Sequence, residues 1–313
     1  MKKRKILLLV SLLLSSVLFA QEFKKTATSG FVFLEIPVTA RTAALGEASI
    51  ALSDLNSSSV FNNPGALGFV NNNHSLSLSY SPWIADIKNY ASSYSFRSDL
   101  GVFGVSFLMF DYGDMPRTAV ASGQKAYDVL GKFTANSSAI GLSYSKMLTD
   151  RFSFGVTIKY VNEKIDVYSA NNVLFDGGII YYTGLSSLRI AASIQNFGVD
   201  TKFINDKFRM PAILRLGVTA EVIGNKVSDY MVTMTAEANH ASDSDERLSF
   251  GTELSWKNMF FLRGGYKFFY DEETYSFGLG LRANYSMPVE VDFAYSAYGR
   301  LGNISRFTVQ LGL

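Results

Sequence analysis

Apolar and polar residues alternate along most of this chain, from about Ser75 to the last residue. In residues 152–160, Phe, Val, Ile and Tyr occupy every second position, and Ser, Gly, Thr and Lys occupy the positions between them. Residues 275–285 and 307–313 repeat this pattern. Because successive side chains of a β-strand point to opposite faces, the alternation predicts strands with one apolar and one polar face.

The length of these runs favours a membrane protein over a soluble one. Most of these runs extend over about nine to thirteen residues, whereas strands of soluble proteins average nearer five or six. A strand that crosses the hydrocarbon layer at a tilt needs about ten residues. We therefore predict an all-β fold, a transmembrane antiparallel β-barrel, and not a soluble β-sandwich.

Charged residues within the predicted strands fall on the same face as the Ser and Gly residues. In a membrane barrel this face lines the lumen, where water or opposite charges are available. We expect pairing between neighbouring strands, for example Arg282 with Glu290 or Asp292; the alternative is a path for an ion or a substrate. The lumen-facing charges are Lys159, Arg189, Arg215, Glu237, Glu253, Arg263, Lys267, Arg282, Glu290 and Asp292.

Marking each run predicts fourteen strands, an even number as in bacterial single-chain barrels. Short connections alternate with longer ones, apart from a medium link at residues 223–229. The longer connections, residues 111–134, 198–210 and 241–246, are the predicted extracellular loops. The predicted strands are residues 75–81, 89–97, 101–110, 135–147, 152–163, 172–183, 187–197, 211–222, 230–239, 247–256, 259–268, 275–285, 289–298 and 304–313.

Residues 1–20 have the layout of a secretory signal peptide, with basic residues from Lys2 to Lys5, an apolar run from Ile6 to Leu14 and small residues before Ala20. This run is too short to span a bilayer as a helix. We expect cleavage near Ala20 and export to the outer membrane of a Gram-negative cell. The 25 Phe, 17 Tyr and 25 Gly against 6 Pro fit a β-rich chain with many turns.

Residues 21–74 have a different character. Residues 39–52 are rich in Ala and predict a short helix that breaks near Gly46, and residues 62–68 form a turn cluster. About fifty residues are too few for an independent core. Because a barrel of about fourteen strands is wide enough to leave an open channel, we expect residues 21–74 to pack inside the barrel of residues 75–313 as a hatch or plug.

Four short segments carry a family resemblance: Gly30 to Leu34, Ala40 to Gly46, Asn63 to Ala66, and Leu78 to Ile87. The chain resembles the PorV/PorQ family of outer-membrane proteins, which belongs to the FadL-like superfamily of long-chain fatty-acid channels. One difference is the order Asn63-Pro64-Gly65-Ala66, where the family usually has Asn-Pro-Ala-Gly.

The resemblance implies a hatch inside the barrel and a role in type IX secretion. PorV-like members escort cargo from the translocon and recognise its folded C-terminal signal domain. The expected partners are therefore outer-membrane lipid, the translocon and cargo signal domains. The hatch residues that the resemblance indicates are Arg41, Gly46, Asn63, Pro64 and Gly65.

The predicted extracellular loops supply candidate partner-binding residues. Trp83, Ile84 and Asp86 lie in the first loop, where Trp83 is either a partner anchor or an anchor at the lipid headgroups. Met115 and Tyr127 lie in the loop of residues 111–134. The sequence leaves four roles open for this loop. It covers the barrel mouth, it binds cargo, it receives a hydrophobic solute, or it packs only on itself as a lid.

Other chemistry receives little support from the sequence. Without cysteine there are no disulfides or Cys-based metal sites, and a net charge of +2 does not indicate nucleic-acid binding. His240 near Ser242 is a loose candidate for a lipase pair, and we predict no enzymatic activity, no cofactor and no metal. Asp243, Asp245 and Glu246 predict a solvated loop and not a calcium site.

Two functions remain. The first is a protein-binding barrel that assists type IX secretion by binding or shuttling cargo or by docking to the translocon. The second is a FadL-like channel for hydrophobic small molecules, which needs an apolar pocket. The polar residues of the predicted lumen face favour a sealed barrel, and so favour the first function over the second and over a structural porin.

Overall fold

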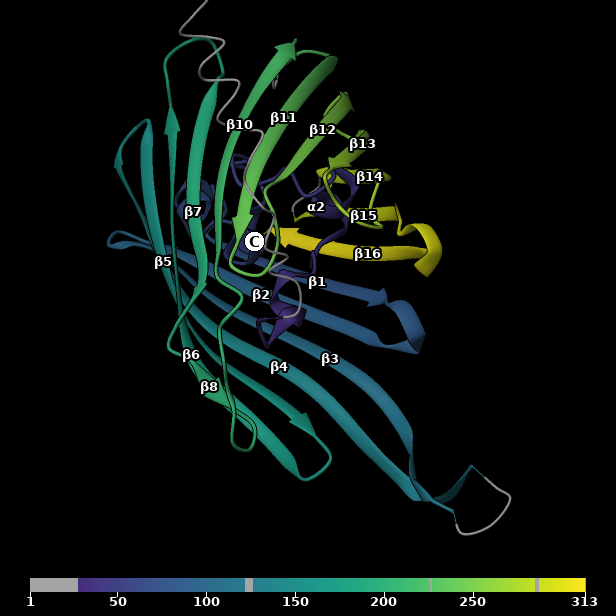
Figure 1. The fold of residues 1–313 in the computed structure, drawn as a ribbon. Coiled ribbons are helices and arrows are strands. Elements are labelled where there is room, and N and C mark those ends of the chain that lie inside the picture. Colours follow the sequence, from purple (N-terminus) through teal and green to yellow (C-terminus); the bar gives the residue numbers. More distant parts are fainter. Residues whose placement is uncertain (1–27, 122–125, 226, 285–286, 313) are drawn as a thin grey trace, which may run out of the picture.

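Fourteen antiparallel strands close into a barrel in which β1 pairs with β16 (Figure 1). The computed structural model describes residues 28–121, 126–225, 227–284 and 287–312. The prediction of fourteen strands is confirmed, and the predicted signal peptide lies outside the described residues. The barrel strands are β1 His74–Pro82, β2 Lys88–Ser98, β3 Gly101–Val120, β4 Tyr127–Thr149, β5 Phe152–Ile165, β6 Tyr168–Tyr182, β7 Arg189–Phe197, β10 Ile213–Ile223, β11 Tyr230–Ala241, β12 Arg247–Trp256, β13 Phe260–Phe268, β14 Tyr275–Asn284, β15 Pro288–Ala297 and β16 Asn303–Gly312.

Large apolar side chains cover the outer face of the barrel. In β14, Phe277 and Leu279 are exposed, whereas the alternating Ser276 is buried, and in β10 Leu216 is exposed while Arg215 is buried. An apolar belt of this extent is typical of a surface that faces lipid. Among the described residues, no helix is long and apolar enough to cross a membrane.

The longest predicted loop is wrong, because residues 111–134 are mostly strand. β3 continues to Val120 and β4 begins at Tyr127, and these two residues pair with each other. In the described part of the chain, β3 pairs with β2 only up to Asp111, and β4 pairs with β5 only from Ala135. The rest of this ribbon, the projecting hairpin (residues 112–121 and 126–134), extends away from the barrel (Figure 1).

A second predicted loop also contains strand. Within residues 198–212, β8 Thr201–Lys202 pairs with β9 Lys207–Phe208 as a small separate hairpin. Two short 3-10 helices, η4 Ile84–Asp86 and η5 Gly299–Leu301, lie in other connections on the same side of the barrel.

Residues 28–73 form the lumenal segment, which lies within the ring of strands (Figure 1). It contains the short helices η1 Val32–Glu35, α2 Ala40–Ala44, η2 Asn56–Phe61 and η3 Pro64–Phe69. The helix ends just before Gly46, where the sequence predicts the break, because Gly46 and Glu47 have φ values of 63° and 69° and turn the chain. A side chain at Gly46 would also press on the backbone of β13, 3.0 Å from the Tyr266 nitrogen.

Candidate functional site in the barrel lumen

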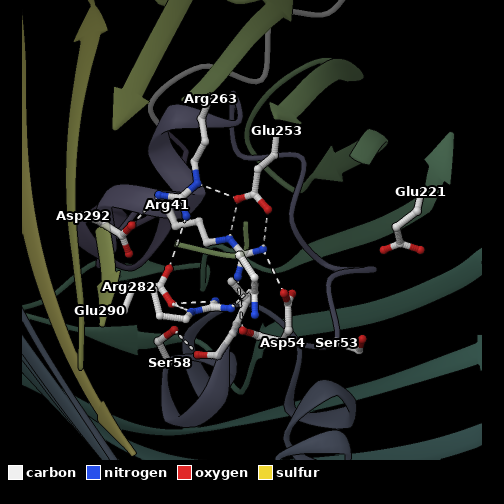
Figure 2. A network of polar contacts seen from close by, with 12 residues as sticks. Arg41, Ser53, Asp54, Ser58, Glu221, Glu253, Arg263, Arg282, Glu290 and Asp292 are labelled. Carbon is white, nitrogen blue, oxygen red and sulfur yellow. Dashed lines mark hydrogen bonds and ion pairs between the residues drawn. The ribbon is translucent and has the colours of Figure 1, made fainter. Parts of the chain in front are cut away.

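Arg41 joins helix α2 to the barrel wall through ion pairs. Its Nε and Nη2 atoms each lie 2.9 Å from a carboxylate oxygen of Glu253 on β12, and Nη2 also donates to Asp54 at 3.1 Å (Figure 2). The Arg41 side chain is only 2 % exposed. Burial by itself lowers the pKa of Arg41, but the carboxylates of Asp54 and Glu253 raise it well above its ordinary value. Arg41 is therefore a permanent charge in the lumen.

The network continues along the wall through Arg263 of β13 (Figure 2). Arg263 donates to Glu253 at 2.6 Å, to Glu290 at 3.2 Å and also to Asp292. Arg282 donates to the other oxygen of Glu290 at 2.7 Å. The expected pairing of lumen charges is thus confirmed for Arg282 and Glu290, whereas Asp292 pairs with Arg263. We call these five residues with Arg41 and Asp54 the Arg41 network.

A second ionic cluster lies around Glu47 of the lumenal segment. Lys267 of β13 pairs with Glu47, and Arg215 of β10 lies 3.8 Å from Glu47 and 3.3 Å from Glu237. Glu237 also accepts the backbone N–H of Ser49 at 2.9 Å. The lumen-facing charges of β10 to β13 therefore bind the lumenal segment as well as one another.

The opposite side of the lumenal segment is held by a polar cap and close packing. The Asn63 side chain accepts the Gly65 N–H at 2.9 Å, which caps η3 at the position where Pro64 begins the helix. Its amide nitrogen donates to the carbonyls of Ile50 at 2.9 Å and Ile179, in β6, at 3.1 Å. Asn63 thus joins two parts of the segment to the wall.

Glycines in the wall make this approach possible. A Cβ atom at Gly178 of β6 would overlap the Asn63 amide, and one at Gly155 of β5 would overlap the backbone of Pro64. A Cβ at Gly65 would lie 2.7 Å from the carbonyl oxygen of Gly178. The departure from the usual family order therefore places the smaller residue where the segment and the wall are closest.

Aromatic residues close the extracellular end of the lumen. Phe31 of the lumenal segment lies 5.8 Å from Phe208 of the β8–β9 hairpin, and Phe33 lies 5.8 Å from Phe110 of β3. Met210 and further apolar residues pack against these rings, and we call the whole group the mouth cluster. The cavity beside it, lined by residues that include Leu34 and Lys159, has a volume of about 40 Å³.

Trp83 takes part in the same closure. Its ring is half-buried, lies 5.2 Å from the Tyr298 ring and has the Arg306 guanidinium 5.1 Å above it. A ring held in this way packs on the barrel mouth with part of its surface covered. Ile84 is half-buried and Asp86 is exposed.

The other candidate loop residues lie on the projecting hairpin. Met115 is half-buried and pairs with Phe133, whereas Tyr127 is exposed near the tip. The hairpin therefore brings both onto one extension, although strand structure and not an irregular loop places them there.

The loop between β11 and β12 also differs from its prediction. Asp243 is buried, and only Asp245 and Glu246 are exposed as a solvated loop requires. His240 interacts with Glu246 at 2.9 Å, while the Ser242 hydroxyl donates to the Met210 carbonyl. His240 and Ser242, the candidate lipase pair, thus interact with different partners. Among the described residues, no group of three or more acidic, His or Cys side chains could hold a metal ion.

An apolar exterior, a closed ring of fourteen strands and a polar lumen together define an outer-membrane β-barrel protein. The family model for type IX secretion system protein PorV matches residues 19–178, which is half of the chain. The chain therefore belongs to the PorV family, as the sequence motifs predicted, and its place is the outer membrane. A comparison with curated protein sequences found no match.

Solved structures with the same fold include hydrocarbon channels. The toluene transporter TbuX of Ralstonia pickettii has a TM-score of 0.60 at 11 % identity, with 91 % of this chain and 98 % of that chain covered. The CymD monoaromatic hydrocarbon channel has a TM-score of 0.58 at 10 % identity, covering 90 % and 97 %. The Pseudomonas putida toluene transporter TodX also has 0.58, at 12 % identity, covering 87 % and 96 %. At these identities the likeness is one of fold.

Proposed function

We propose that this protein assists type IX secretion as a protein-binding barrel, in which the lumenal segment seals the pore and the extracellular side binds a secreted protein or the translocon. Membership of the PorV family supports the link to this secretion system. The filled lumen is the observation that carries the proposal, and the projecting hairpin supports its protein-binding part.

The centre of the lumen is occupied by paired charges. Arg41, Arg263 and Asp292 are at most 2 % exposed, so water reaches almost none of their surface. Opening a passage there would separate buried ion pairs, and removing one partner from such a pair typically costs about 3–5 kcal/mol. A barrel filled in this way acts through its surface more readily than through its lumen.

The lumen also offers little apolar space. A cavity that takes up benzene measures about 150 Å³, whereas the cavity beneath the mouth cluster measures about 40 Å³. Larger cavities of about 390 Å³ at the periplasmic end and about 220 Å³ at the mouth are lined by charged and amide side chains such as Asp54, Arg282 and Arg247. Uptake of hydrophobic small molecules, the alternative, therefore has weaker support in the described lumen.

The projecting hairpin presents apolar side chains away from the membrane belt. Val120 is 95 % exposed, and Tyr127 and Leu130 are also largely exposed. Arg117 pairs at 2.5 Å with Asp166 of the neighbouring β5–β6 turn, which braces the base of the hairpin. Exposed apolar groups on a braced extension are typical of a protein-binding surface.

The test is deletion of the gene, followed by measurement of the surface delivery of proteins that carry the C-terminal secretion signal. We expect delivery to fall and to recover with the wild-type gene, while uptake of toluene stays unchanged. Unchanged delivery together with lost toluene uptake would contradict the secretion role and favour the channel.

A matched pair of variants tests the hairpin. Val120→Asp combined with Leu130→Asp places charge on the projecting surface, and Val227→Asp places it on an equally exposed valine, 94 % exposed, in a turn at the other end of the barrel. We expect the hairpin variant to reduce delivery about tenfold, corresponding to a loss of about 1.4 kcal/mol of binding. The turn variant should behave as wild type, and equal effects of both would exclude the hairpin as the binding surface.

A further inference from the structure

Two carboxyl groups face each other where the extracellular β11–β12 loop covers the lumenal segment. Glu35, at the end of η1, lines one cavity with Ala241 and Arg247, which flank this loop, and the Asp243 carboxyl group lies near enough to raise its pKa. Asp243 is 8 % exposed, although its neighbours Asp245 and Glu246 are exposed to solvent. A loop of three acidic residues thus turns one of them inward, against another acid.

One oxygen atom of each carboxyl group lacks a donor. Glu35 Oε1 and Asp243 Oδ1 are buried and have no hydrogen-bond partner among the described residues. Two ionised carboxylates can only accept hydrogen bonds, and their like charges repel each other. A single proton between them turns one carboxyl group into a hydrogen-bond donor to the other and removes one of the two charges.

The nearby arginines compensate the two carboxyl groups only in part, because each of them also has another partner. Arg215 is already paired with Glu237 and lies near Glu47, and Arg247 stacks 4.7 Å above the Tyr270 ring. The charged and titratable groups that line the same cavity as Glu35 are Glu47 of the lumenal segment, Arg215 of β10, Arg247 of β12, and Tyr270 and Glu273 of the β13–β14 loop.

We propose that Glu35 and Asp243 share a proton, and that this proton holds the β11–β12 loop closed over the lumenal segment. The loop is also attached through Ser242. Its N–H donates to the Ala212 carbonyl at 2.9 Å, and its hydroxyl donates to the Met210 carbonyl at 3.1 Å and lies 3.4 Å from that of Ser29. When the proton leaves, the two negative charges repel and the extracellular mouth of the barrel opens.

We call the protonated contact between Glu35 and Asp243 the latch. The pKa of Glu35 gives the pH range in which the latch is closed. Burial, and then the nearby Asp243 carboxyl group, raise the pKa of Glu35 to about 8 from its ordinary value of 4.5, against the opposing effect of Arg247. The closed loop therefore binds a proton that the open loop releases. Closure is fully stabilised below pH 4.5, weakens as the pH rises towards 8, and loses this contribution above 8.

Hydrogen exchange of the full-length protein in lipid nanodiscs tests the latch, at about pH 5 and about pH 9 with correction for the intrinsic exchange rate. In the wild type we expect the amides of residues 242–245 to exchange at least about tenfold faster at the higher pH, since one pKa unit is a tenfold change. Glu35→Gln keeps the shape and donates permanently to Asp243, so its protection should not change with pH. Asp245→Asn removes an exposed charge from the same loop and should behave as wild type.

Three results would overturn the proposal. The first is that Glu35→Gln still loses protection at high pH, and the second is that Asp245→Asn abolishes the pH dependence. The third is that added calcium restores wild-type protection at high pH, because a bridging cation and not a proton would then close the loop. If Glu35→Gln does not assemble, Asp243→Asn takes its place.

Infrared spectroscopy observes the proton itself. The wild type should show a protonated-carboxyl band that titrates near pH 8, where the raised pKa of Glu35 lies. This band should be missing in Glu35→Gln. A band identical in the two proteins would also overturn the proposal. The latch does not depend on which protein binds at the mouth, so a failure of the secretion role leaves this test intact.

Discussion

The two sides of the lumenal segment are attached to the same barrel by different physics. On the side of β12 to β15, Arg41 reaches Glu253 through long charged side chains. On the side of β5 and β6, the turn at Asn63 rests against wall glycines, with backbone close to backbone. The first attachment depends on charge balance, and the second depends on the absence of side-chain atoms.

This difference determines which substitutions each side tolerates. Ion pairs fail when one charge is lost, since the remaining buried charge has no solvent to replace its partner. Close packing fails when volume is added, since the wall and the segment have no free space between them. The same segment should therefore respond to the removal of charge on one side and to the addition of a methyl group on the other.

The largest effect is expected for Arg41→Met. It leaves Glu253 and Asp54 with less compensation in a buried network, and should lower the free energy of unfolding by about 3–5 kcal/mol. Urea unfolding in detergent micelles measures it. The exposed pair of Arg300 and Glu272 provides the control, and Arg300→Met should cause no measurable change. Equal stability of both variants would show that the network does not hold the segment.

A somewhat smaller loss is expected for Gly178→Val, because the new side chain overlaps the Asn63 amide. We expect a cost of about 3 kcal/mol, at the upper end for overpacking, and a displaced segment that lets ions through in planar-bilayer recordings. Gly264→Val is the control, since a Cβ there meets nothing within 4 Å on the outer face. If Gly178→Val stays silent and as stable as this control, the close packing is not required.

The smallest effect is expected for Gly65→Ala, which adds one methyl group 2.7 Å from the carbonyl oxygen of Gly178. A cost of about 1–2 kcal/mol should appear as a lower urea midpoint with an unchanged slope. The control is Ala66→Gly, which changes the neighbouring residue of the same turn. It adds no atom near the Gly178 carbonyl, so it should not lower the urea midpoint through this contact. Unchanged stability of Gly65→Ala would show that the residue order at this turn has no structural importance.

The strand count could be predicted because lipid and lumen impose opposite requirements on alternate residues. The projecting hairpin was predicted as a loop because this contrast between alternate residues is missing there. From Gly113 to Val120 both faces of the ribbon meet water, so the sequence lacks an apolar face to detect. The contacts of Trp83 could not be predicted, because nothing near it in sequence indicates its distant neighbours Tyr298 and Arg306.

The sequence by itself determined the fourteen strands, the faces they turn to lipid and lumen, and the family, and it limited the expected partners of Arg282 to Glu290 or Asp292. These follow from local periodicity, from register between adjacent strands or from short motifs. Only the tertiary structure decided that Arg41 meets Glu253 and that Glu35 meets Asp243. Each pair joins residues about two hundred positions apart, and closure of the barrel around the lumenal segment, not any local pattern, brings them together.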